Sequence, residues 1–431
     1  MNSASARSPL VRPPVPVVDI DLARPGEFRL PGDRGQVRPQ GQARALVRLH
    51  GRPLGMVSAA NASGPDGLWR ALAGTAQVEL AGQLARHRAV DGTGPSDGDT
   101  DEACRDVRPD ALHQAPVISV VVATRDRPEK LRRCLRSLLR STYPEFEIIV
   151  VDNAPADGAT EALVRGDFTG RVRYVHESVA GLARAHNLGL ARARGSVVAF
   201  TDDDTLVDPG WLSALAETFA RDTRIGCVTG LIVPAELETP AQSALERQGG
   251  FAKGYVPRTW SLFDPPADPL FPFTAGRFGS GANMAFRTDV LRALGGFDPA
   301  TGAGTPGRGG DDLLAFFEIL TAGHTLAYQP RAIVWHCHRR TQDALAAQAF
   351  GYGAGLGAYL TGALLSNPRR LPALLRRLPR GIRYAMTRSR DRGADPEADW
   401  SRRLALLEVR GMVYGPCGYL RGRLTGAGVG S

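Results

Sequence analysis

Strand-like segments alternate with helix-like segments between residues 117 and 204, and this alternation constrains the fold more than any other feature. The strand-like runs are VISVVVAT (117–124), FEIIVVDN (146–153), VRYVHE (172–177) and SVVAFTDDD (196–204). Helical patterns lie between them at about 128–141, 158–165 and 181–194. Continuous apolar, β-branched runs are typical of strands buried on both faces of a parallel sheet. The sequence therefore predicts an α/β fold with a mostly parallel sheet flanked by helices.

Polar side chains follow three of these strands at the point where each ends. Thr124 and Arg125 close the first strand, Asp152 closes the second, and 202–204 is a run of three aspartates. Ligands of such sheets bind beyond the carboxyl ends of the strands. Three carboxylates beside a buried strand need a cation among them, and a divalent ion with oxygen ligands meets that need. A solvated acidic turn is the alternative interpretation.

Four motifs in one frame resemble family 2 glycosyltransferases. They are VISVVVATRDRPEKLRRCLRSLL…YPEFEIIVVDN, GLARAHNLGLARARGSVVAFTDDD, FGSGANMAFRTDVLRALGGFDP and GRGGDDLLAFFEILTAGH. The resemblance covers residues 116–340. It implies a GT-A domain, which is a Rossmann-like fold of the nucleotide-diphospho-sugar transferase superfamily. The activity that it implies is hexosyl-type transfer from a nucleotide-diphosphate sugar to an acceptor hydroxyl.

The resemblance implies a donor site across the strand ends. Its positions are Thr124, Arg125, Asp152, Arg184, Asn187, Asp202, Asp203 and Asn283. Asp152 matches the residue that reads the base, often uracil, so a UDP-sugar is favoured. Asn283 belongs to GSGANMAF (279–286), which would approach the transferred sugar.

The resemblance also implies a metal site and a general base. Asp202 and Asp204 match the outer carboxylates of a DXD motif that holds Mn²⁺ or Mg²⁺. His336 is expected to complete the metal site, with His338 as the alternative, and both could instead be surface histidines. Asp311 and Asp312 match the acidic pair of the acceptor side.

Asp312 would take the proton of the acceptor hydroxyl in a single inverting displacement. Alternatively, Asp311 and Asp312 cap the N-terminus of the helix that begins at these residues. Capping and catalysis are compatible with each other.

The flanking regions lack these motifs. For residues 1–90 the sequence predicts a small α+β domain, with strands at 17–22 and within 43–57 and a helix at about 68–88. Residues 91–115 are rich in Gly, Asp and Pro and are predicted to form a linker. Residues 341–431 predict a helical, Arg-rich region. The chain carries a net charge of +9, and residues 366–431 hold 14 Arg against five acidic residues, so the excess lies in this tail.

Arginines alternate with apolar residues at 368–390, as on a helix that lies on an anionic membrane. We expect peripheral contact with the inner face of the plasma membrane, near an acceptor that could be lipid-linked. The uncharged stretch 344–365 predicts either a small-residue helix packed on the main domain or an interfacial or marginally spanning helix. Scattered cysteines and the absence of an apolar leader in the first residues favour the cytoplasm.

Three other classes of protein compete with this interpretation. A processive synthase would carry Q-x-x-R-W, which is absent from the sequence, so non-processive transfer is expected. A nucleotidyltransferase would carry a Gly-rich loop after its first strand, whereas ATRDRPEK contains no glycine. A basic nucleic-acid-binding protein would need a pattern of stacking aromatics, which the tail does not show, so no nucleic-acid partner is expected.

Overall fold

The computed structural model describes residues 12–32, 34–91, 116–366, 372 and 398–427. The predicted linker and the Arg-rich stretch 368–390 therefore lie almost entirely outside the described residues. The domain boundaries expected at 90, 115 and 340 remain predictions.

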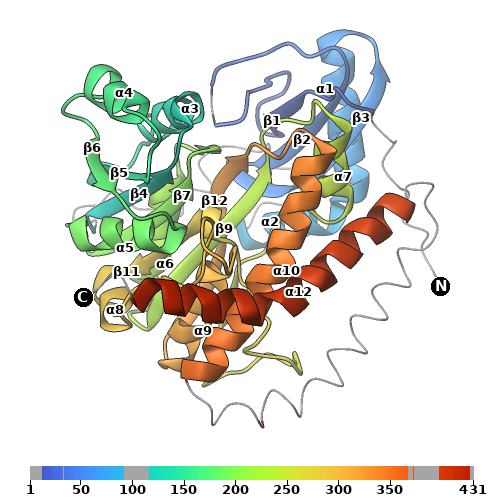
Figure 1. The fold of residues 1–431 in the computed structure, drawn as a ribbon. Coiled ribbons are helices and arrows are strands. Elements are labelled where there is room, and N and C mark those ends of the chain that lie inside the picture. The colour runs from blue at the N-terminus through green and yellow to red at the C-terminus, as the bar shows by residue number, and fades with distance from the viewer. Residues whose placement is uncertain (1–11, 33, 92–115, 367–371, 373–397, 428–431) are drawn as a thin grey trace.

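A nine-stranded sheet forms the centre of the molecule (Figure 1). Its strands are β4 (Ile118–Thr124), β5 (Phe146–Asn153), β6 (Arg173–Glu177), β7 (Val197–Asp202), β8 (Thr205–Val207), β9 (Ile225–Pro234), β10 (Arg258–Trp260), β11 (Met284–Arg287) and β12 (Thr325–His336). The order is β10-β12-β9-β11-β7-β4-β5-β6, and β8 pairs with β12. The pairings make β4, β5, β6, β7, β9 and β12 run in one direction. The predicted α/β class with a mostly parallel sheet is confirmed.

Helices cover both faces of this sheet, as the alternation of side chains along its strands requires. They are α3 (Pro128–Leu138), α4 (Ala159–Asp167), α5 (Leu182–Arg192), α6 (Trp211–Arg221), α7 (Pro240–Arg247), α8 (Thr288–Ala293) and α9 (Asp311–Thr321), with 3₁₀ turns η2 (Ala275–Arg277) and η3 (Gly281–Asn283). Along β4, Val120 and Val122 face the core shared with α3 and α6, while Val121 faces the core shared with α5 and α9.

The N-terminal region forms a separate three-stranded sheet with its own apolar core. Its elements are β1 (Val17–Asp21), β2 (Gly41–Leu49), β3 (Arg52–Ala62), α1 (Gly64–Glu79) and α2 (Ala81–Asp91). The single helix expected at 68–88 is divided at Leu80, whose buried side chain lies over Gly55 of β3. A Cβ on Gly55 would come within 2.5 Å of the Leu80 side chain, so the glycine provides the space that Leu80 occupies at the break between α1 and α2.

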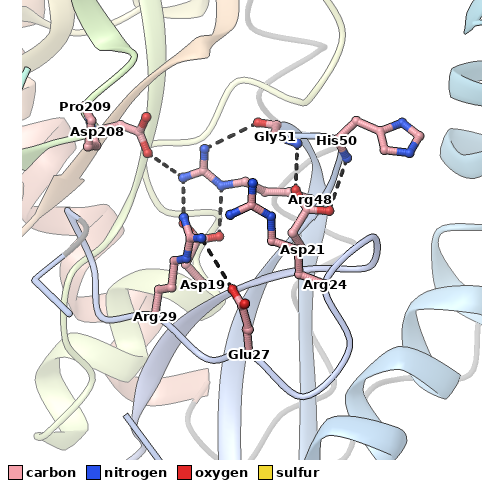
Figure 2. A pocket seen from close by; sticks show the side chains of 10 residues that line it. All are labelled: Asp19, Asp21, Arg24, Glu27, Arg29, Arg48, His50, Gly51, Asp208 and Pro209. Carbon is pink, nitrogen blue, oxygen red and sulfur yellow. Dashed lines mark hydrogen bonds and ion pairs between the residues drawn. The ribbon is translucent and has the colours of Figure 1, made fainter. Parts of the chain in front are cut away.

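A buried ion triad joins this small sheet to the large one (Figure 2). Arg48 of β2 lies 2.6 Å from carboxylate oxygens of both Asp19 and Asp208, and Asp208 directly follows β8. The three side chains are only 11–14% exposed. Burial raises the pKa of Asp19 to about 6, although Arg48 opposes the shift. The charge of Arg48 therefore compensates two carboxylates from different parts of the chain.

The C-terminal region consists of two long helices that lie against each other, α10 (Gln342–Ser366) and α12 (Ala398–Ala427). Glycines line their contact: a Cβ on Gly415 would lie 2.5 Å from the carbonyl oxygen of Ala354 and 2.6 Å from Cα of Gly357. The uncharged stretch 344–365 thus forms a helix packed on the protein, by way of α9 and α12. Within the described residues, no helix combines the length and apolar character that crossing a bilayer requires.

Candidate active site at the carboxyl ends of the strands

The parallel register brings the predicted polar residues to one edge of the sheet. Thr124 pairs with Asp152 across β4 and β5, and Ala123 pairs with Asp202 across β4 and β7. From the opposite direction β8 pairs with the end of β12, which sets His336 beside Thr205 and next to the aspartate run. Strand pairing alone therefore gathers residues that lie more than a hundred positions apart in the sequence.

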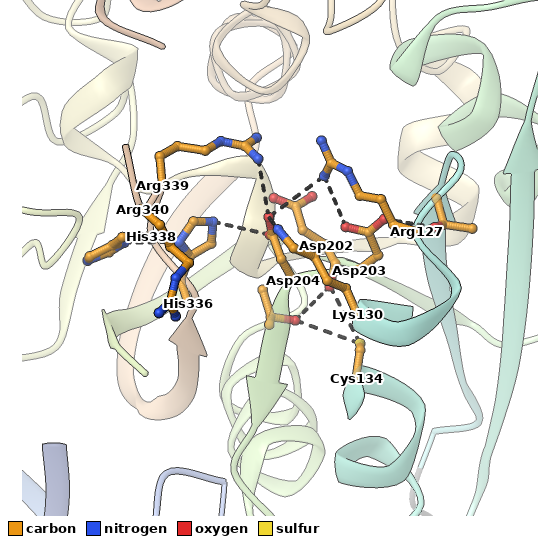
Figure 3. Close-up of polar contacts among 12 residues, drawn as sticks. Arg127, Lys130, Cys134, Asp202, Asp203, Asp204, His336, His338, Arg339 and Arg340 are labelled. Atoms are coloured by element: carbon orange, nitrogen blue, oxygen red, sulfur yellow. Dashed lines mark hydrogen bonds and ion pairs between the residues drawn. The ribbon is translucent and has the colours of Figure 1, made fainter. Parts of the chain in front are cut away.

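Asp202, Asp204 and His336 form a cluster that could hold a metal ion (Figure 3). One oxygen of each carboxylate and one imidazole nitrogen all lie within 4.8 Å of one another. Asp204 and His336 are buried and Asp202 is partly exposed, so the cluster is open on one side. Two carboxylates and an imidazole suit Mn²⁺, which accepts both oxygen and nitrogen ligands. The residues present thus fit the ion that the resemblance implies.

Three cationic side chains from outside the predicted set surround Asp204. Nζ of Lys130 lies 3.4 Å from its Oδ2, and Arg127 and Arg339 lie 3.7 Å and 3.9 Å from the same oxygen. Sequence reasoning missed all three, although Arg127 and Lys130 stand in the RDRPEK motif and Arg339 follows the two histidines. Beside a bound metal these cations suit the charge of a diphosphate.

The charges of the cluster shift the pKa values of its members in opposite directions. Burial acts to raise the pKa of Asp204, but His336, Lys130 and Arg339 outweigh it and hold that pKa well below its usual range. Burial and the neighbouring Asp204 raise the pKa of Asp202 to about 6. Burial acts to lower the pKa of His336, and Asp204 overcomes this effect and raises it. Asp204 thus keeps its negative charge, while Asp202 and His336 beside it bind protons more readily than usual.

Asp203 is turned away from the metal cluster toward β4. Its Oδ2 accepts a hydrogen bond from the Thr124 hydroxyl at 2.7 Å, and its Oδ1 accepts one from Arg127 at 3.3 Å. Asp152 is fully buried, where it accepts a hydrogen bond from the Tyr174 hydroxyl at 2.9 Å. Arg125 is exposed at the rim and lies 3.5 Å from Asp126. These predicted donor residues share the strand-end edge.

Two predicted donor residues have amides that bind the protein itself. The Asn187 amide exchanges hydrogen bonds of 2.7 Å with both the N–H and the C=O of Phe297. Asn283 is fully buried; it donates to the carbonyls of Leu231 and Ala332 and accepts from Nε1 of Trp211. In this geometry both asparagines hold segments of the site together. Arg184 lies half-buried on α5.

The predicted acidic pair opens α9. The helix follows Gly310, whose φ of +86° favours glycine, and Asp311 and Asp312 occupy its first two positions. Asp312 accepts hydrogen bonds of 2.8 Å from the N–H groups of Gly281 and Leu313. Burial and the neighbouring Asp311 raise the pKa of Asp312 to about 6. Oδ2 of Asp311 lies 3.5 Å from Nδ1 of the buried His186, a neighbour that the sequence did not reveal.

Comparisons with known proteins agree with this geometry. Residues 119–295 match the family model for glycosyl transferase family 2. The resemblance seen in the sequence is confirmed.

Among curated relatives, the chain is 29% identical over 241 residues to a pre-mycofactocin glycosyltransferase of Mycobacterium tuberculosis. The aligned residues make up 55% of this chain and 46% of the relative. It is 32% identical over 225 residues to the succinoglycan biosynthesis protein ExoM of Rhizobium meliloti. This alignment covers 50% of the present chain and 65% of ExoM. The chain thus spans about half the length of the mycobacterial relative. Among solved structures, a mannosyltransferase of Pyrobaculum calidifontis in complex with GDP-Man and Mn²⁺ aligns over 76% of this chain and 91% of its own, with 21% identity and a TM-score of 0.45.

Proposed function

We propose that the protein is a metal-dependent, inverting, non-processive glycosyltransferase. It would move a sugar from a nucleotide-diphosphate donor to an acceptor hydroxyl in polysaccharide, cell-envelope or glycoconjugate synthesis. The observation that carries the proposal is the convergence of Asp202, Asp204 and His336 at the strand ends of a family 2 domain. A bound Mn²⁺ or Mg²⁺ would offset the charge that builds on the departing nucleoside diphosphate.

The residues of the chain divide the remaining work of this reaction. Arg127, Lys130 and Arg339 stand around the cluster, where they would bind the diphosphate. Asp203 and Thr124 would fix the strand-end loop that the nucleoside crosses, and Asp152 would take part in reading the base. A UDP-sugar is the donor that we favour. Asn187 and Asn283 would support the site through the backbone that they hold.

Asp312 is the residue that we propose as general base. Its two accepted N–H bonds fix the carboxylate at the start of α9, and it remains partly exposed. A carboxyl whose pKa is raised to about 6 is ionised at neutral pH and still basic enough to accept a proton from a reacting hydroxyl. Asp311 would act beside it, against His186.

A donor panel tests the proposal directly. The full chain with Mn²⁺ is offered UDP-, GDP- and dTDP-sugars, and donor hydrolysis and thermal stabilisation are measured. We expect one nucleotide class, with UDP favoured, to raise the melting temperature only when the metal is present. If no nucleotide sugar of the panel is hydrolysed or raises the melting temperature, the assignment is wrong.

We further propose a cytoplasmic protein that contacts an anionic membrane at the inner face, near a lipid-linked acceptor. The outer side of α12 supports this. Apolar residues recur along it at spacings of three, four or seven positions, which place them on one face of the helix. They are Leu406, Val409, Val413, Leu420 and Leu424, and each is at least 50% exposed. The exposed Arg402, Arg410 and Arg421 lie beside them. Two copies of this stripe would bring arginines together, whereas anionic headgroups would complement them.

Vesicle sedimentation tests the membrane contact. The full chain should pellet with vesicles of phosphatidylglycerol and phosphatidylcholine and stay in solution with phosphatidylcholine alone. Val413→Glu should reduce the pelleted fraction. Val78→Glu is the matched control, because Val78 is 74% exposed on α1 and Val413 is 73% exposed. Equal pelleting of the two variants would contradict the role of α12.

A further inference from the structure

A chain of three hydrogen-bonding contacts leads from the metal cluster into the protein. Nε2 of His336 lies 3.3 Å from Oδ1 of Asp204 on the side of the cluster. On the other side of the ring, Nδ1 of His336 lies 3.1 Å from Nδ1 of His338. Nε2 of His338 then lies 2.9 Å from Oε1 of Glu246, in the last turn of α7. Figure 3 shows both histidines beside the aspartates.

The chemistry of these groups fixes where the hydrogens lie. An ionised Glu246 only accepts hydrogen bonds, so Nε2 of His338 must carry the hydrogen. A metal ion bound at Nε2 of His336 would take the place of the contact with Asp204 and would require the hydrogen of that ring on Nδ1, which lies 3.1 Å from Nδ1 of His338. Nδ1 of His338 would then be the acceptor, so the one hydrogen of the neutral His338 ring would lie on Nε2, where Oε1 of Glu246 accepts it at 2.9 Å. The carboxylate of Glu246 therefore favours the tautomer of His336 that can offer its Nε2 lone pair to a metal.

We propose that Glu246 is a positioning residue for the metal site, because it sets the tautomer of His336 through His338. The inference rests on the proposed metal-dependent function. Metal-ligating histidines commonly donate their second N–H to a fixed acceptor, which orients the ring and raises its basicity. Here the acceptor is a second histidine, and the carboxylate that fixes its tautomer comes from α7.

The surroundings of Glu246 hold it in place. Its Oε2 lies 3.9 Å from the Arg44 guanidinium of β2, so the N-terminal sheet touches the far end of the chain of contacts. Gly250 has a φ of +49°, and a Cβ there would lie 2.5 Å from Oε1 of Glu246. The Phe251 ring packs against both imidazoles, with centroid distances of 5.1 Å to His336 and 5.6 Å to His338. Little room is left for another rotamer at either histidine.

Nitrogen-15 NMR of the metal-free, full-length protein tests the hydrogen positions without any metal or donor. We expect the hydrogen of His338 on Nε2, toward Glu246, and its Nδ1 unprotonated. Finding a hydrogen on Nδ1 of His338 would overturn the proposal. This measurement decides the tautomer even if the proposed function itself fails.

Mn²⁺ affinity, measured by electron paramagnetic resonance, tests the consequence for the site. Glu246→Ala should weaken Mn²⁺ binding by about 10- to 100-fold. Glu246→Gln keeps an acceptor oxygen and should remain close to the parent. Glu217→Ala is the matched control, because Glu217 is 12% exposed against 14% for Glu246 and pairs with Arg331 away from the site. Parent-like affinity in Glu246→Ala would refute the role of Glu246, whereas a parent protein that binds no Mn²⁺ would refute the proposed function.

Discussion

Nε2 of His336 lies 3.3 Å from Oδ1 of Asp204, so the last residue of β12 meets the last aspartate of the run that begins at the end of β7. The pairing of β8 with β12 produces this contact. Around it the chain gathers one further carboxylate, Asp202, and three cationic side chains. The predictions below concern the parts of this arrangement and the contacts that support it.

Asp204→Asn should abolish Mn²⁺ binding and lower sugar transfer at least about a hundredfold, since the metal is expected to supply several kcal/mol of transition-state stabilisation. Calorimetric titration with Mn²⁺ and a transfer assay measure the two effects. Asp222→Asn is the control, because Asp222 lies in an exposed pair with Arg224. Full activity of the Asp204→Asn protein would show that Asp204 is not a metal ligand.

Asp312→Asn should lower the turnover rate by about 10²- to 10⁴-fold while donor binding stays unchanged, because only the proton acceptor is lost. Asp311→Asn should have the smaller effect, since Asp311 faces the buried His186. Single-turnover kinetics and donor titration separate the two steps. A larger loss of turnover in Asp311→Asn than in Asp312→Asn would mean that Asp311, and not Asp312, is the general base.

Transfer should depend on pH through Asp312. Its pKa is raised to about 6, so the carboxyl is protonated and inactive as a base at pH 5 and ionised at pH 7. The rate should therefore rise with pH through an apparent pKa of about 6 and then level off. The profile is recorded at saturating Mn²⁺, because the pKa of Asp202 is also raised to about 6. A rate that stays flat from pH 5 to pH 8 would contradict this role.

Arg48→Met should lower the free energy of unfolding by about 3–5 kcal/mol, because it leaves Asp19 and Asp208 buried without their cation. Urea denaturation measures the change. Arg29→Met should cost less than about 1 kcal/mol, since Arg29 and Glu27 are 38% and 40% exposed. Similar losses in the two variants would mean that the triad does not anchor the N-terminal sheet.

Gly415→Ala should lower the free energy of unfolding by about 1–3 kcal/mol, because its Cβ would press on the carbonyl of Ala354 and on Gly357. Gly74→Ala should instead stabilise by about 0.5–1 kcal/mol, since Gly74 lies within α1 with nothing within 4 Å of a new Cβ. Thermal and urea unfolding compare the two variants. A stabilising Gly415→Ala would show that α10 and α12 do not touch as closely as described.

Local sequence patterns predicted β4, β5, β6 and β7 of the main sheet, because the residue types that favour a strand act within the segment itself. β4, β5 and β7 form where β-branched apolar runs occur, and polar residues follow them because the chain leaves the sheet there. The sequence also predicted His336 in the cluster, by way of the family resemblance. It did not predict the break at Leu80, because the cause is Gly55 on another strand.

The sequence by itself determined four strands of the main sheet, the positions of the carboxylates and the resemblance to family 2 glycosyltransferases. Only the tertiary structure decided that Lys130 and Arg339 meet at Asp204, that Asn283 is turned into the sheet, and that Glu246 reaches His338. The physical reason is that strand periodicity acts between near neighbours in the chain. A charge cluster or a hydrogen-bond chain instead depends on which distant segments the sheet register brings within 3–4 Å.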